Sequence, residues 1–265
     1  IFIFKLGLGI KGSALATVVS QAVSAIWVLA YFKSGKSILK IRKRNLRPEP
    51  AIILEITKIG VSPFFMQIAA SIVTVISNYS LLAYGGVLAV AAMGVINRVS
   101  MLILMPIFGI NQGAQPIIGF NYGAKNYARV MEALKISAYA ATVLAVAGFA
   151  MVQIFDVHII KMFNDNPELI EIGSHGMRIV LLMLPIIGFQ IVGTGYFQAV
   201  GKAGQALLLS MSRQVILLIP LLLVLPRFFG LNGIWAAGPI ADFISSVLTL
   251  VLLTVDNKKL AVKRR

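Results

Sequence analysis

The 265-residue chain has no cysteine, only two histidines and only nine acidic residues, against 24 lysines and arginines. The lack of cysteine excludes disulfides, thiolate metal sites and a cysteine nucleophile. The acids and histidines form no cluster at metal-ligand spacing, and the chain has neither a Gly-x-Ser-x-Gly elbow nor a phosphate-binding loop. We therefore expect no catalytic residue, no metal site and no cofactor.

The chain is instead rich in long apolar stretches, and its mean hydropathy is +0.90. Seven stretches reach the roughly 20 residues needed to cross a bilayer. They lie at about 12–32, 56–84, 88–119, 136–155, 173–199, 205–226 and 231–254. The sequence therefore predicts an all-α polytopic membrane protein with about seven transmembrane helices and membrane lipids around it.

Basic residues are concentrated in every second loop, and this pattern predicts which loops face the cytoplasm. The loop after the first stretch runs from Lys33 to Arg47 without an acid, and such loops stay in the cytoplasm. Counting onward, the turn at 84–86 falls outside, and the loops carrying Lys125, Lys202 and Arg213 fall inside. The net charge of +15 thus indicates membrane topology and not a nucleic-acid partner.

A weak internal repeat suggests how the stretches group. Gly9 and Gly12 precede the first stretch, and Gly230 and Gly233 precede the last at the same spacing. This predicts that residues 1–32 end one lobe and that 52–254 form a second lobe of six helices. Residues 33–51 would then be a basic cytoplasmic linker and 255–265 a basic tail. Because the chain also begins at Ile1 without a start methionine, we expect an upstream half to be missing.

Several segments carry a resemblance to a known family. They are Asn97–Met101 with the Gly-, Pro-, Asn- and Gln-rich run to Gly123, Gly195–Lys202, Gly9–Thr17, and Ser20 with Gln21. Together they resemble the multidrug and toxic compound extrusion (MATE) family over nearly the whole chain.

The resemblance implies one half of a twelve-helix exporter in the bacterial plasma membrane. Such a protein opens alternately to each side and expels cationic or amphipathic organic compounds in exchange for H⁺ or Na⁺. An Asp-Pro pair typical of related efflux proteins would lie upstream of Ile1. Of that coupling neighbourhood, only Thr17 matches a position in this chain.

Polar side chains within the apolar stretches are the candidate substrate contacts, because amides and hydroxyls suit varied amphipathic ligands. The residues predicted from spacing and composition are Gln67, Ser71, Asn78, Asn97, Arg98, Gln112, Gln115, Gln190 and Gln198. Thr74 shares the helical face of Gln67, Ser71 and Asn78, and Thr194 that of Gln190 and Gln198. Interhelical hydrogen bonding is an equal alternative for these groups, and Arg98 could instead snorkel to the headgroups.

Asp242 is the one acid placed well inside an apolar stretch, the others being assigned to stretch ends, loops or tails. An intramembrane carboxylate often binds or releases a cation, so Asp242 joins Thr17 as a candidate for ion coupling. Two other functions stay open: a flippase for lipid-linked oligosaccharides, which needs a larger and more basic cavity, and a non-transporting membrane scaffold or enzyme.

Overall fold

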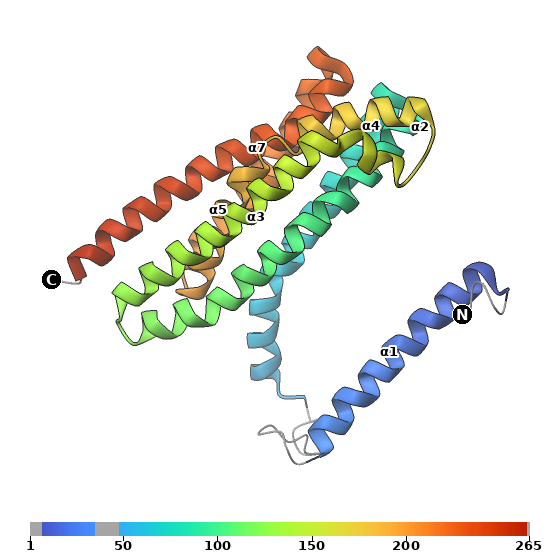
Figure 1. The fold of residues 1–265 in the computed structure, drawn as a ribbon. Coiled ribbons are helices and arrows are strands. Elements are labelled where there is room, and N and C mark those ends of the chain that lie inside the picture. The colour runs from blue at the N-terminus through green and yellow to red at the C-terminus, as the bar shows by residue number, and fades with distance from the viewer. Residues whose placement is uncertain (1–6, 35–47, 264–265) are drawn as a thin grey trace. The chain divides into compact units, whose positions relative to one another are not determined.

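A computed structural model describes the backbone of residues 7–34 and 48–263, and every element in these ranges is a helix (Figure 1). In chain order they are α1 (Gly9–Lys33), α2 (Pro50–Gly123), α3 (Tyr127–Lys161), α4 (Pro167–Val180), α5 (Leu184–Ala199), α6 (Ala203–Met211), the π-helix η2 (Ser212–Leu218) and α7 (Ile219–Lys263). The predicted all-α fold is confirmed.

The chain divides into two compact units, residues 1–60 and 61–265. The first contains α1 and the start of α2, and the second contains the remaining helices. The predicted linker at 33–51 falls largely outside the described residues, so the four predicted domain boundaries stay predictions.

Within the described residues, four helices are long and apolar enough to cross a membrane, and α4 with α5, bent by 49°, makes a fifth span if counted as one. Two of the four, Gln67–Gly123 and Gly204–Lys258, have 57 and 55 residues. At 1.5 Å per residue each would extend for about 80 Å, more than twice the hydrocarbon thickness of roughly 30 Å. A single straight span is therefore excluded for both.

Glycines divide these two long stretches. Gly86 has φ +67° and ψ −167°, and Gly230 has φ +54° and ψ −133°. Such conformations are open almost only to glycine, so each glycine allows the helix to reverse. Divided there, the described helices give seven apolar segments, and the turn predicted at 84–86 is confirmed. Gly9, the proposed repeat partner of Gly230, also has a positive φ, +51°.

Within residues 61–265 the helices form an up-and-down bundle (Figure 1). The chain reverses at Gly86, at residues 162–166 and at Gly230 near one end, and at 124–126 and 200–202 near the other. Asn126 and Asn166 start α3 and α4, since each side chain accepts a backbone N–H of the first helical turn.

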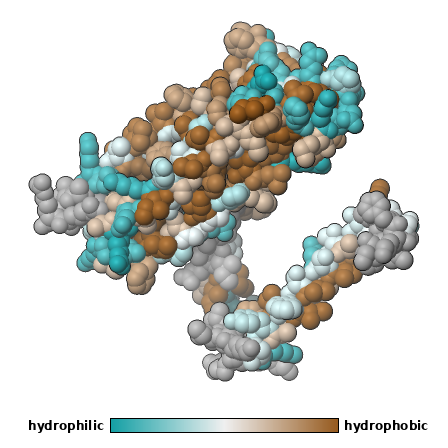
Figure 2. All heavy atoms as spheres, viewed as in Figure 1, coloured by the Kyte–Doolittle hydropathy of each residue, from teal (hydrophilic) through white to brown (hydrophobic). Residues whose placement is uncertain are grey.

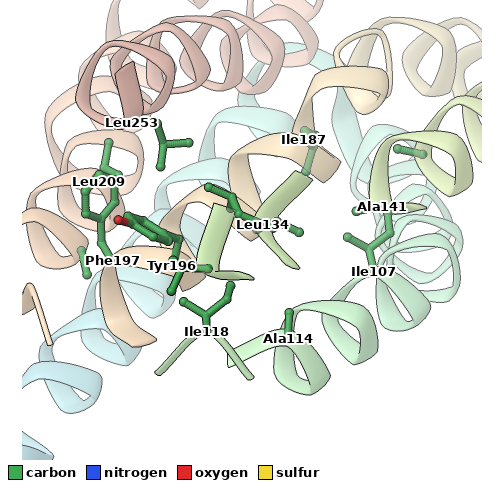
Figure 3. Close-up of a cluster of buried hydrophobic side chains, with 14 of the residues drawn as sticks. Ile107, Ala114, Ile118, Leu134, Ala141, Ile187, Tyr196, Phe197, Leu209 and Leu253 are labelled. Carbon is green, nitrogen blue, oxygen red and sulfur yellow. The ribbon is translucent and has the colours of Figure 1, made fainter. Parts of the chain in front are cut away.

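Helix α5 lies at the centre of this unit, packed against both α3 and α7. One buried cluster surrounds it, with Ile107 and Ile118 from α2, Leu134 from α3, and Tyr196 and Phe197 from α5 (Figure 3). A second cluster, built around Trp235 of α7, fills the other end of the unit with side chains from α2, α3 and α4. Apolar packing therefore runs the length of the bundle.

The face of residues 61–265 seen in Figure 2 is mainly apolar in the middle and polar at both ends. Large apolar side chains such as Phe120, Tyr139 and Ile216 are exposed on it. A soluble protein would bury such groups, whereas lipid chains solvate them. This arrangement is that of a multi-pass membrane protein.

Two aspartates that the sequence analysis placed at stretch ends or in the tail are buried. Asp156 on α3 is hydrogen-bonded to both Nε and Nη2 of Arg178 on α4, at 2.5 and 3.2 Å. Asp256 on α7 accepts hydrogen bonds from the Tyr196 hydroxyl, at 2.6 Å, and from Lys202. Asp256 lies in the predicted tail at 255–265, where α7 continues past it, and its carboxylate contacts α5.

The Asp256 contact generates a stability prediction. Replacing Asp256 with leucine leaves the buried Tyr196 hydroxyl without an acceptor, which costs about 1 to 3 kcal/mol. Asp256→Asn keeps an acceptor oxygen and should lose less. We expect the thermal unfolding midpoint of the purified protein to fall in the order wild type, Asp256→Asn, Asp256→Leu. The exposed Glu132→Gln is the control, and an Asp256→Leu midpoint equal to it would contradict the structural role.

A second prediction tests the contact between α3 and α5. A Cβ on Gly188 would lie 2.6 Å from the backbone oxygen of Ala141, whereas a Cβ on Gly113 would meet no atom within 4 Å. We expect Gly188→Ala to lower stability by about 1 to 3 kcal/mol through overpacking. Gly113→Ala should be neutral or stabilising, because alanine is the better helix former. Equal unfolding midpoints for the two variants would show that α3 and α5 do not pack this closely.

Candidate functional site

A cavity of about 560 Å³ lies within the second unit, between α2, α5, α6 and η2. This volume is in the range of sites that hold drug-sized molecules. Its apolar wall includes Leu104, Phe108 and Ile187. Its polar lining consists of Gln67, Asn111, Gln190, Thr194, Gln198, Ser210, Arg213 and Gln214. The combination of apolar wall and polar side chains makes it the candidate functional site.

Helix α5 contributes the row of side chains predicted from their four-residue spacing. Gln190, Thr194 and Gln198 all line the cavity. Gln190 also donates from Nε2 to the Ser245 hydroxyl of α7 at 2.6 Å, and its Oε1 accepts from Ser246 at 3.5 Å. Gln190 therefore both lines the cavity and forms hydrogen bonds between α5 and α7.

Helix α2 contributes less of its predicted row. Gln67 lines the cavity, while the Ser71 hydroxyl donates to the Gln67 backbone oxygen at 3.0 Å. Asn78 lies in a separate apolar hollow beside Val75 and Tyr79. The structure thus brings Gln67 to the cavity and leaves Ser71 and Asn78 outside it.

The other predicted residues of α2 also lie outside the cavity lining. Asn97, Arg98 and Gln112 are exposed on the surface of α2. Gln115 is half-buried and donates from Nε2 to Gln198 Oε1 at 3.4 Å, which places it next to a lining residue. None of these positions is tested as a ligand contact, and their roles stay predictions.

Asp242 proves to be one half of a buried ion pair. Its side chain is 5% exposed and accepts a hydrogen bond from Nε of Arg213, which lies on η2 and lines the cavity. The sequence analysis assigned Arg213 to a cytoplasmic loop, and this is wrong, because the helical segment begins ten residues earlier at Ala203. Thr17, the other candidate for ion coupling, is exposed on α1 and donates to the Ser13 backbone oxygen at 3.1 Å.

The π-helix explains how Arg213 reaches the cavity. A π-helical turn holds more residues than an α-helical one and is common at functional sites. In this chain it directs Arg213 and Gln214 toward the cavity that Ser210 of the preceding α6 also lines. The sequence analysis did not predict these three residues as site residues, because no sequence pattern predicts the π-helix and Arg213 was assigned to a loop.

Asn111 also lines the cavity and was not among the predicted site residues, although it lies in the Gly-, Pro-, Asn- and Gln-rich run that ends at Gly123. A Cβ on Gly195 would lie 1.9 Å from Asn111 Oδ1, so the glycine makes room for this amide between α2 and α5. In the sequence, Gly193 and Gly195 around Thr194 were the features that could have predicted a close approach of another helix here. Among the described residues no group of three or more His, Cys, Asp and Glu side chains could hold a metal ion.

Comparisons with known proteins give the family. The MatE family model matches residues 63–224, more than half of the chain. The multidrug export protein MepA of Staphylococcus haemolyticus is 25% identical over 264 residues, and MepA of Staphylococcus aureus is 26% identical over 269. The chain spans 58% of the length of both relatives.

Solved structures show the same fold. The MATE multidrug transporter DinF-BH, solved as a complex, is 42% identical with a TM-score of 0.82, and the match covers 96% of this chain and 57% of DinF-BH. A transporter of Pyrococcus furiosus is 22% identical with a TM-score of 0.85, covering 98% of this chain and 59% of its own; at that identity it supports the fold alone. These relatives are exporters and transporters, not enzymes. The chain is a multi-pass membrane protein that belongs to the MatE family of multidrug and toxic compound extrusion transporters.

Proposed function

We propose that the protein containing this chain is a secondary active multidrug exporter of the plasma membrane. It expels cationic or amphipathic organic compounds in exchange for H⁺ or Na⁺. Two lobes alternate between inward-open and outward-open states, and residues 61–265 belong to one of them. The family match and the drug-sized, amide-lined cavity together support this proposal.

The cavity is the single structural observation that carries the proposal. Its amides and hydroxyls present both donors and acceptors, and its apolar wall accepts ring systems. Such a lining binds chemically varied amphipaths without demanding one fixed shape or charge.

The cavity argues against a flippase for lipid-linked oligosaccharides. That cargo carries a polyanionic headgroup and needs a large basic site. Among the described lining residues Arg213 is the one cation, and Asp242 pairs with it. The size and the charge balance both favour smaller amphipathic cargo.

Asp242 and Thr17 remain the candidates for ion coupling in this chain. Asp242 is the stronger, because it is buried beside the cavity and its charge is balanced by a group that a ligand in the cavity can touch. Exchange for H⁺ or for Na⁺ can be separated in proteoliposomes. Ethidium uptake should respond to an imposed pH gradient in the first case and to a Na⁺ gradient in the second.

Expression of the gene at its natural length provides the cellular test. We expect it to lower ethidium accumulation in cells lacking their own exporters, and residues 1–265 alone to leave it unchanged, since alternating access needs both lobes. Gln67→Ala removes one hydrogen-bonding group and should weaken apparent ethidium affinity by about two- to tenfold. Asp242→Asn should also weaken export.

The matched control is Asn257→Ala, which removes an exposed amide outside the cavity. It should export like the wild type at the same expression level. Ethidium accumulation that the natural-length gene does not change would overturn the proposed function. Unchanged export in both Gln67→Ala and Asp242→Asn would remove the cavity from the pathway.

A further inference from the structure

Among the described residues, the cavity offers a ligand a guanidinium group but no carboxylate. Arg213 is among its lining residues, whereas Asp242 is not, and no other Asp or Glu of the described residues lines it. We propose that Arg213 binds the carboxylate of an amphipathic ligand here, so that the cavity binds a zwitterionic ligand more tightly than the same ligand without a free carboxylate. This inference deepens the proposed transport function and rests on it.

The hydrogen bonds of Arg213 leave most of its donors available. A guanidinium has five N–H groups, and one of them, on Nε, is given to Asp242 Oδ1. The other four have no hydrogen-bond partner among the described residues. The side chain is 35% exposed, against 5% for Asp242, so the guanidinium lies between the carboxylate and the cavity. Its free donors suit the paired oxygens of a carboxylate.

Asp242 has two physical effects on this group. It balances the guanidinium charge, which lowers the cost of holding arginine among apolar helices. It also fixes the Nε edge, so that less side-chain freedom is lost when a ligand binds. An organic cation without a carboxylate lacks this contact, and the Asp242 carboxylate is buried behind Arg213.

The remaining lining accommodates the rest of such a ligand. Gln67, Gln198 and Gln214 supply amide donors and acceptors, and Leu104, Phe108 and Ile187 supply an apolar wall for rings. Cations without an acceptor group can still contact the amides. Ethidium has no carboxylate, so its export tests the proposed function and not the carboxylate contact.

A matched pair of dyes separates the carboxylate from the ring system. Rhodamine 110 carries a free carboxylate, and rhodamine 123 is its methyl ester and a permanent cation. Binding of each to the purified natural-length protein in detergent can be followed by fluorescence polarisation. We expect the wild type to bind rhodamine 110 more tightly than rhodamine 123.

The test variant is the double substitution Arg213→Gln with Asp242→Asn, which leaves no unpaired buried charge. Rhodamine 110 should bind about tenfold or more weakly, as expected on losing hydrogen bonds between charged groups, and rhodamine 123 within about twofold of the wild type. Retained rhodamine 123 binding also shows that the cavity is folded. Arg213→Lys keeps the charge and loses the paired donors, so its affinity for rhodamine 110 should lie between those of the wild type and the double variant.

Unchanged rhodamine 110 affinity in the double variant would overturn the inference. So would an equal loss of affinity for both dyes in Arg213→Lys. Failure of the proposed function would be seen in the cellular test, where cells expressing the wild type would export neither ethidium nor either dye. The two failures are therefore distinguishable.

Discussion

An apolar surrounding leaves polar side chains no water to bind, so each must find a partner within the protein or face a wet cavity. The buried aspartates and Gln190 of the second unit follow this constraint. Asp156, Asp242 and Asp256 each meet a basic side chain from another element, and Gln190 meets two serines of α7. These contacts link α3 to α4, α5 to α7 and η2 to α7 across otherwise apolar interfaces. Several other polar side chains, Gln67, Asn111, Thr194 and Gln198 among them, line one cavity.

The three ion pairs lie at different places in the bundle, and their basic residues have different surroundings. Arg178 is more than half exposed, and its pair with Asp156 joins α3 to α4, the two helices that the 162–166 loop connects. Lys202 and Tyr196 hold Asp256 at the opposite end, between α5 and α7. Arg213 alone turns toward the cavity. The same chemistry therefore stabilises both ends of the unit and supplies a charged group in its middle.

Hydropathy and spacing predicted much of this molecule. The apolar stretches emerge as helices because their length matches a bilayer, and the turn at Gly86 follows from glycine's conformational freedom. Gln190, Thr194 and Gln198 share a face because the helical repeat is fixed, and all three reach the cavity. Sequence alone did not show that Arg213 meets Asp242 or that Asp256 meets Tyr196. Those partners are 29 and 60 residues apart, and only helix packing brings them together. Asp256 resembled a tail residue because basic residues follow it closely.

If the cavity is a water-accessible part of the substrate path, labelling of a single cysteine can show it, because these 265 residues contain no cysteine of their own. A cysteine at position 67, replacing Gln67, can be labelled with a water-soluble maleimide, with and without ethidium, in the natural-length protein with any cysteine outside these residues replaced by serine. If the cavity conducts substrate, the Gln67→Cys variant is labelled and ethidium slows the labelling, while Asn257→Cys is labelled at a rate that ethidium does not change. An inert Gln67→Cys, or one labelled equally fast with ethidium present, would contradict the claim.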